Sequence, residues 1–241
     1  MNPIKFRSYK LFYQNLEAAE SMLRQIEDFP SFFSPTAERP IFIDCGANIG
    51  ISVLEWKHRW PACRIICFEP DPHAFAILNK NMLVNDVPDV RCIRAALSDV
   101  KGFATLYGNI DQRGDARGNS IDPAWGQREN SGEVQVPTVR LGSYIDQEPI
   151  DFLKMDIEGS EFAVLNDIRK KLHMVNAVYV EVHETTSTNS YNSLVKIEQL
   201  LGEAGFTFEV EHRAQAHALP LAARKWQESV GAKQSHIMGW R

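Results

Sequence analysis

One short stretch, residues 41–50, constrains the fold more than any other part of the chain. An apolar run ends at Asp44, and the glycines Gly46 and Gly50 then bracket Asn48 before an amphipathic segment begins. This order is typical of a buried strand, a tight turn and a helix, which form the first half of a βαβ unit. The stretch therefore predicts an α/β protein with a parallel sheet.

The next apolar run, residues 64–68, ends at Glu69, about 19 residues after Gly50. An acidic side chain at this distance from a glycine turn is where nucleoside-binding folds place the acceptor for the ribose hydroxyls. Asn48 occupies the position of the second glycine in a dinucleotide-binding turn, and no Gly-Lys-Ser or Gly-Lys-Thr follows to make a P-loop. A ligand with a ribose but no phosphate fits best, and S-adenosylmethionine is the leading candidate.

The other polar groups of this stretch suit the methionine half of S-adenosylmethionine. Asp44 is expected to accept its ammonium group, and the N–H groups of the turn and of the helix N-terminus are expected to bind its carboxylate. Gly46, Asn48, Gly50 and Glu69 complete this part of the predicted cofactor site. The alternative is a strand–turn–helix unit that binds nothing, in which Glu69 is a solvated strand end.

Two later strand ends are expected at the same crevice. Asp71 is predicted to cap a helix over residues 72–85, and it is counted with the cofactor-binding residues. Residues 90–95 form a third predicted strand, and Ser98 lies just past its end. Because ligands of doubly wound sheets lie outside the carboxyl ends of the strands, Ser98 is a candidate for the adenine edge. A plain turn serine is the alternative.

The composition is that of an ordinary globular protein. Of its 241 residues, 44% are hydrophobic and 24% are charged. The formal net charge of −5 argues against a general nucleic-acid-binding protein, although a local basic patch stays open. The four cysteines fall in or beside predicted strands, which indicates free buried thiols and a reducing cytoplasm. No apolar run approaches the roughly 18 residues that span a bilayer, and the N-terminus lacks a secretory pattern.

The chain is predicted to consist of an N-terminal helical extension, residues 1–39, and a domain that spans residues 40–241. A helix over residues 16–29 of the extension is expected to cover an edge of the sheet. The alternative is a wall of the substrate pocket, with contributions from Arg7, Tyr9 and Tyr13.

A polar, glycine-rich stretch, residues 109–132, interrupts the predicted domain. Loops of this length inside compact domains are usually functional or disordered. We hypothesise that this stretch is a mobile lid over the acceptor substrate. Its arginines permit an anionic acceptor, but a solvated face is the favoured interpretation.

A second polar stretch follows the apolar run of residues 150–155. Asp156 lies at the predicted C-terminal tip of this strand. Glu158 and Glu161 are expected to begin a helix, where acidic side chains ordinarily complement the helix dipole. Asp156 is therefore the stronger functional candidate of the three.

The following predicted strand, residues 177–183, ends with Glu181 and His183. The period of two places both side chains on the same face of the strand. Together with Asp156 at the neighbouring strand tip, they are expected to face one pocket beside the nucleoside crevice. These three residues are the predicted catalytic group.

These stretches resemble the FkbM-type family of S-adenosylmethionine-dependent methyltransferases. The matching segments run in the family's order over residues 40–210: Phe42-Ile-Asp-Cys-Gly-Ala-Asn-Ile-Gly50, Phe68-Glu-Pro-Asp-Pro72, Ala96-Leu-Ser-Asp99, Leu153-Lys-Met-Asp-Ile-Glu-Gly-Ser-Glu161 and Val180-Glu-Val-His183. The first segment alone suggests only a methyltransferase, and its combination with the fourth is specific to this family. The resemblance implies a Rossmann-like, doubly wound sheet of seven strands, six parallel and one antiparallel, and usually O-methylation.

Carried over position by position, the resemblance places Asp156 near the reactive centre and assigns the cofactor to Asp44, Gly46, Asn48, Gly50 and Glu69. Cys45 stands where the family often has valine. Residues 1–39 and 211–241 carry no family match. With residues 109–132, they are expected to determine the acceptor.

The expected reaction transfers a methyl group from the sulfonium to a hydroxyl of a small-molecule acceptor, such as a sugar or a natural product. His183 is the expected general base near neutral pH, with Asp156 or Glu181 orienting it or acting instead. Alternatively, Asp156 and Glu181 hold Mg²⁺, which takes oxygen ligands. Two other classes stay open: an NAD-type oxidoreductase, and a cofactor-binding or interaction module without chemistry.

Overall fold

The computed structural model describes residues 2–27, 29, 31–110, 115–128, 130–146, 148–212 and 229–241. The main apolar runs of the sequence form one sheet of seven strands: β3 (Ile41–Cys45), β4 (Arg64–Phe68), β5 (Val90–Ile93), β9 (Ile150–Met155), β10 (Val175–Glu184), β11 (Thr207–His212) and β12 (Lys233–Trp240).

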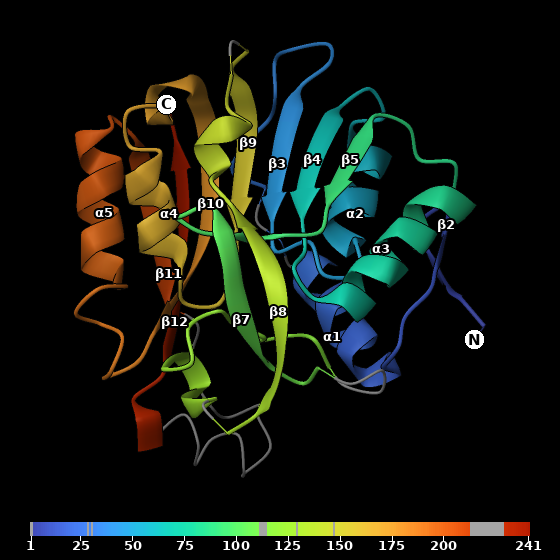
Figure 1. Cartoon of the computed structure of the whole chain (residues 1–241). Coiled ribbons are helices and arrows are strands. Elements are labelled where there is room, and N and C mark those ends of the chain that lie inside the picture. Colours follow the sequence, from blue (N-terminus) through green and yellow to red (C-terminus); the bar gives the residue numbers. More distant parts are fainter. Residues whose placement is uncertain are drawn as a thin grey trace.

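The spatial order of these strands is β11-β12-β10-β9-β3-β4-β5 (Figure 1). The strand β12 pairs antiparallel with both of its neighbours, and the other four pairings are parallel. Six strands of this sheet therefore run in one direction and one runs against them. The predicted Rossmann-like, mostly parallel, seven-stranded sheet is confirmed.

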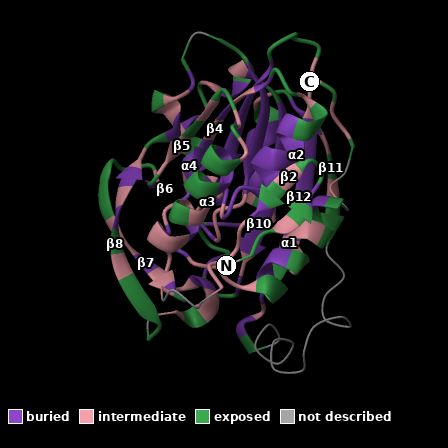
Figure 2. Ribbon diagram, turned by 90° about the vertical axis from the view of Figure 1, so that its right-hand side faces the viewer, coloured by how far each residue is buried: buried purple, intermediate pink, exposed green. Residues whose placement is uncertain are grey.

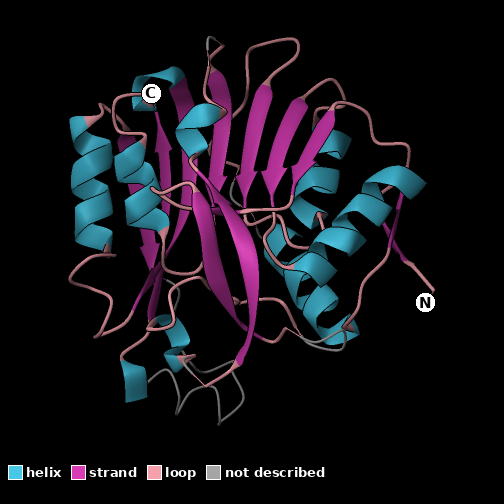
Figure 3. Ribbon diagram, in the orientation of Figure 1, coloured by secondary structure: helices cyan, strands magenta, loops and turns pink. Residues whose placement is uncertain are grey.

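Helices cover both faces of the sheet (Figure 3). They are α1 (Leu16–Glu27), α2 (Ile51–Arg59), α3 (Pro72–Val84), α4 (Glu161–Asp167) and α5 (Leu194–Glu203). On one face, Ile43 and Leu153 of the sheet share an apolar core with α4 and α5. On the other, Phe42 and Phe152 share a second core with α1, α2 and α3. The central strands are buried between these layers, which explains why most of their residues are apolar (Figure 2).

The strand order reverses between β3 and β9, because β4 and β5 follow on one side of β3 and β10 lies on the other side of β9. In doubly wound folds the ligand crevice opens at this switch point, outside the carboxyl ends of the strands. The turn after β3 and the residues after β4 and β9 therefore meet at one edge of the sheet.

Further strands lie outside the main sheet. β1 (Ile4–Phe6) and β2 (Tyr9–Leu11) form an antiparallel pair, and β6 (Ala96–Leu97), β7 (Gly102–Gly108) and β8 (Gly132–Val139) form a three-stranded sheet. Short 3₁₀ helices occur at η1 (Trp125–Gln127), η2 (Leu141–Ser143) and η3 (Leu172–Met174). In the predicted lid, residues 111–114 and 129 lie outside the described residues.

The four cysteines are free thiols, three of them buried. No helix in the part of the chain that the structure describes combines the length and apolar character needed to cross a bilayer.

Candidate active site

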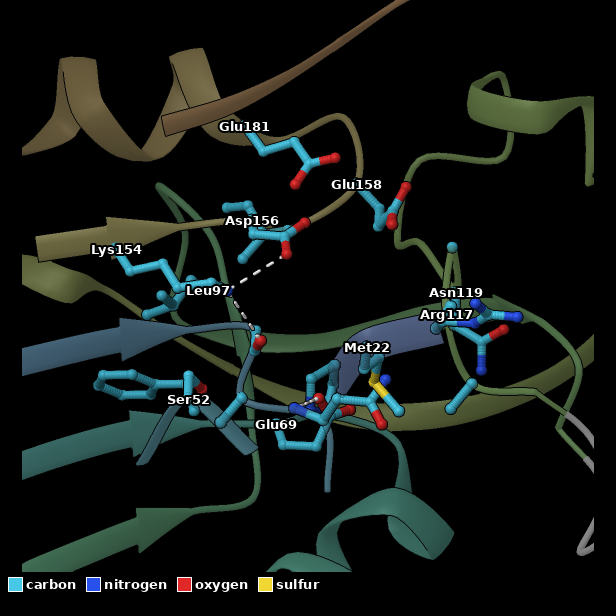
Figure 4. Close-up of a pocket in the computed structure, with 18 of the residues that line it drawn as sticks. Met22, Ser52, Glu69, Leu97, Arg117, Asn119, Lys154, Asp156, Glu158 and Glu181 are labelled. Carbon is cyan, nitrogen blue, oxygen red and sulfur yellow. Dashed lines mark hydrogen bonds and ion pairs between the residues drawn. The ribbon is translucent and has the colours of Figure 1, made fainter. Parts of the chain in front are cut away.

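A cavity of about 560 Å³ opens at the switch point of the sheet. Its walls come from the turns after β3, β4 and β9, from α1 and from the segment between β7 and β8 (Figure 4). Glu69 lies in one part of this cavity, and Asp156, Glu158 and Glu181 gather in another. Residues from distant parts of the sequence therefore share a single site.

The glycine turn brings the backbone of β3 against the end of β9. Gly46 adopts φ 88°, and a Cβ built there would lie 1.9 Å from the backbone carbonyl oxygen of Asp156. Gly50 also adopts φ 88°, and a Cβ there would lie 2.6 Å from Leu78 of α3. Gly46 lines the cavity, whereas Gly50 is required by helix packing and is not among the lining residues.

Glu69 is tied to the turn by backbone hydrogen bonds. Its carboxylate accepts from the N–H of Asn48 and from the N–H of Asp71, both at 2.8 Å. Burial raises the pKa of Glu69 to about 8, against the lowering effect of these hydrogen bonds. Glu69 and Asn48 both line the cavity, in agreement with their predicted positions.

Asp44 lies behind the cavity rather than in it. Its side chain is fully buried, accepts a hydrogen bond from the hydroxyl of Ser52, and lies 3.4 Å from the ammonium of Lys154. Lys154 thus supplies an ammonium group beside Asp44, whose Oδ1 is buried without a hydrogen bond. The predicted contact between Asp44 and the ammonium of the ligand stays a prediction.

Asp71 and Ser98 also fall outside the lining of the cavity. Asp71 caps α3 as predicted, because its carboxylate accepts from the N–H groups of His73 and Ala74. The hydroxyl of Ser98 accepts from the N–H of Val100 within a turn, and the preceding residue Leu97 lines the cavity instead. This geometry favours the alternative of a turn serine, and the adenine role of Ser98 stays a prediction.

Asp156 follows β9 and faces the cavity, where Lys154 lies 3.2 Å from its carboxylate. Burial raises the pKa of Asp156, although Lys154 opposes this effect. Burial alone would lower the pKa of Lys154, but Asp156 and Asp44 raise it, so Lys154 stays charged between the two carboxylates. Glu181 of β10 lines the same part of the cavity.

His183 is fully buried and is not among the residues that line the cavity. Its Nδ1–H donates to Glu161 at 2.9 Å, and its Nε2 lies 3.4 Å from Glu158 and 3.7 Å from Glu181. Burial lowers the pKa of His183, but Glu158 and Glu161 outweigh burial and raise it well above its usual range. The structure therefore places His183 beside Glu158 rather than on the lining of the cavity, and its role as the general base stays a prediction.

Glu158 is a site residue that the sequence analysis assigned to a helix start. It precedes α4, adopts φ 57°, and accepts a hydrogen bond from the indole N–H of Trp125 at 2.7 Å. Burial raises its pKa to about 7. Glu158 lines the cavity, and the local sequence pattern carries no signal for its positive φ beyond the following glycine, Gly159.

Two parts of the chain that were expected to lie outside the site, α1 and arginines of the stretch between β7 and β8, line the cavity. Met22 and Gln25 of α1 line it, so this helix forms a wall rather than only a cover. Arg7, one of the predicted wall residues, instead pairs with Glu55 at 2.8 Å. From the stretch between β7 and β8, Arg117 and Arg128 are among the lining residues, together with Asn119.

Comparison with known proteins agrees with this geometry. The model of the methyltransferase FkbM domain matches residues 44–208, which include the glycine turn and the acidic cluster. The chain belongs to the FkbM methyltransferase family. By this membership it is an S-adenosylmethionine-dependent methyltransferase, as the sequence resemblance implied.

Relatives of this chain include methyltransferase sdnD of Sordaria araneosa, which is 30% identical over 69% of this chain and 73% of that protein. The 31-O-demethyl-FK506 methyltransferase FkbM of Streptomyces tacrolimicus is 28% identical over 71% of this chain and 74% of that protein. The crystal structure of methyltransferase FkbM from Methylobacillus flagellatus KT covers 87% of this chain with a TM-score of 0.52 and 16% identity. This chain spans 46% of that protein, and the likeness supports the shared fold.

Proposed function

We propose that this methyltransferase transfers the methyl group of S-adenosylmethionine to a hydroxyl oxygen of a small molecule. The observation that carries the proposal is the position of Asp156. Its backbone carbonyl abuts the glycine turn, and its carboxylate faces the cavity that also contains Glu69. A cofactor at the turn would therefore present its reactive end to the acidic cluster.

In this proposal Glu69 accepts the ribose hydroxyls, and Asn48 and Gly46 shape the surface on which the nucleoside lies. The backbone N–H of Asn48 already donates to Glu69, which holds the carboxylate at the turn. Lys154 positions Asp156 through their ion pair. Asp44, which Lys154 and Ser52 already engage, stays the predicted acceptor of the ligand ammonium.

Transfer to oxygen breaks the carbon–sulfur bond and forms a carbon–oxygen bond, while the hydroxyl loses its proton. The cluster of Asp156, Glu158 and Glu181 supplies carboxylates that can accept this proton. Among relatives, the Streptomyces tacrolimicus protein is named for its action on 31-O-demethyl-FK506, which supports transfer to oxygen. The proposed acceptor is a hydroxylated sugar or natural product.

The test begins with calorimetric titration of the full chain with S-adenosylmethionine and S-adenosylhomocysteine, with NAD as a control. We expect micromolar binding of both sulfur nucleosides and none of NAD. Glu69→Ala should abolish this binding, whereas Glu133→Gln, on an exposed position of β8, should retain it.

Turnover is then measured as S-adenosylhomocysteine release with a panel of hydroxylated acceptors. Release that depends on an acceptor and is lost in Asp156→Asn supports the proposal. Tight cofactor binding with no turnover on any hydroxylated, amine or thiol acceptor would instead indicate a cofactor-binding module without chemistry.

A further inference from the structure

A ring nitrogen and two carboxylates converge at the acidic end of the cavity. Ligand atoms of Asp156, Glu158 and His183 all lie within 4.8 Å of one another. The closest measured pair, His183 Nε2 and Glu158 Oε2, is 3.4 Å apart. Neighbouring ligands of one metal ion are separated by about 3 Å when each bond is about 2.1 Å long. One pair therefore has the spacing of neighbouring ligands of a single ion, and the ligand atom of Asp156 lies within 4.8 Å of both.

A hydrogen bond to Glu161 fixes the orientation of the His183 ring. Its Nδ1–H donates to Glu161, whose carboxylate also accepts from the N–H of Gly159 at 3.0 Å and from the side-chain amide of Asn192 at 2.7 Å. Asn192 in turn donates to the backbone carbonyl of His183 at 2.8 Å. A carboxylate that binds one ring nitrogen of a histidine and directs the other nitrogen outward is the usual support of a metal-bound histidine.

The outward nitrogen has no hydrogen-bond partner. The side chain of His183 is 1% exposed, and its Nε2 is buried without a hydrogen bond while it faces Glu158 and Glu181. Buried polar atoms are nearly always satisfied, so an orphaned nitrogen aimed at carboxylates indicates a group that belongs between them. This observation is independent of the acidic cluster itself.

Two carboxylates, those of Asp156 and Glu158, line the cavity at this point. Glu158 adopts φ 57°, a conformation that costs a non-glycine residue free energy, and its carboxylate lies 3.4 Å from Nε2 of His183. Lys154 lies on the other side of Asp156, where it also pairs with Asp44. Glu158 therefore brings further negative charge to a group of acids, which a cation would stabilise.

We propose that Asp156, Glu158 and His183 bind a divalent transition-metal ion such as Mn²⁺ or Zn²⁺. An imidazole with two carboxylates suits these ions, whereas Mg²⁺ prefers oxygen ligands and retains its water. The site thus differs from the Mg²⁺ pair predicted from the sequence, because His183 and Glu158 are ligands and Glu181 lies beside them. Asp156 and Glu158 line the cavity, so the open coordination positions face the acceptor.

The role of the ion in catalysis rests on the proposed function, but its binding does not. When bound, it would coordinate the acceptor oxygen and lower the pKa of that hydroxyl, as metal ions do for water. The proton would then pass to Glu181 or to solvent.

The test is calorimetric titration of the chelator-treated, dialysed full chain with Mn²⁺, followed by electron paramagnetic resonance of the bound ion. One saturable site is expected in the wild type. Glu158→Gln and His183→Gln should weaken binding at least tenfold. The matched control is His236→Gln. The buried Nε2 of His236 also lacks a hydrogen bond and lies 3.7 Å from Glu181, but His236 belongs to β12 and is not one of the three ligands.

Several outcomes would overturn the site: no saturable binding of Mn²⁺ or Zn²⁺, unchanged affinity in both ligand variants, or equal losses in His236→Gln. If His183→Gln does not fold, Glu158→Gln decides the question, and its S-adenosylmethionine affinity reports whether it is intact. Metal binding without cofactor binding would contradict the proposed function and support the metal site. Cofactor binding without metal binding would support the proposed function and contradict the metal site.

Discussion

At the scale of single residues, the site combines groups whose charge depends on their neighbours. Glu69 shows this most simply, because burial raises its pKa to about 8 while its carboxylate accepts two backbone hydrogen bonds. The carboxylate form is the stronger acceptor for ribose hydroxyls.

We therefore expect the affinity for S-adenosylmethionine to rise between about pH 6 and about pH 9, as Glu69 loses its proton near pH 8. Glu69→Gln should bind roughly ten- to a hundredfold more weakly at the higher pH, the equivalent of about 1.5–3 kcal/mol for hydrogen bonds to a charged group. Calorimetry across this range checks both points. An equally steep pH profile in the variant would assign the titration to another group.

Gly46 provides a prediction about backbone geometry. Gly46→Ala should lower the free energy of unfolding by several kcal/mol, because its Cβ would lie 1.9 Å from a backbone oxygen at a φ that alanine avoids. Gly102→Ala is the matched control, since a Cβ there meets nothing within 4 Å. Urea unfolding measures both, and similar losses in the two variants would contradict this account.

At the scale of elements, the N-terminus of α3 is capped by Asp71, a residue that does not line the cavity. Asp71 accepts two N–H groups of the first turn of α3, so Asp71→Ala should cost about 0.5–2 kcal/mol of stability. Ser193→Ala is a suitable comparison, because Ser193 is the N-cap of α5 but its side chain makes no capping hydrogen bond. Chemical denaturation should show a clearly smaller loss for Ser193→Ala, and a reversed order would exclude capping as the role of Asp71.

At the scale of the whole molecule, the buried carboxylate of Glu69 links folding to pH. The pKa of Glu69 is about 8 in the folded chain and 4.5 in the unfolded chain. Between these two pH values the folded chain therefore keeps a proton on Glu69 that the unfolded chain has lost. The contribution of Glu69 to stability is complete below about pH 4.5 and is lost as pH rises through about 8.

Urea unfolding of the cofactor-free protein at about pH 6 and about pH 9 should therefore show a loss of stability that is smaller in Glu69→Gln. Glu133→Gln, on exposed β8, should behave like the wild type. Parallel pH profiles for wild type and Glu69→Gln would mean that Glu69 does not contribute this linkage.

The amino-acid sequence by itself determined the α/β class, the main strands, the glycine turn and the place of Glu69 at a strand end. These features follow from local patterns: apolar runs, the spacing of the glycines, and strand ends that meet at one edge. Asp156 could be placed for the same reason, since it directly follows a buried strand. The seven-stranded sheet with one antiparallel strand was implied by the family resemblance.

Only the tertiary structure decided what several polar residues do. Asp44 is engaged by Lys154 of another strand, and His183 is oriented by Glu161, which is 22 residues away in sequence. Glu158 lines the cavity from a turn before α4 in which it adopts a positive φ. Burial and partners set the charge and direction of a side chain, and both arise from residues that only the folded chain brings together.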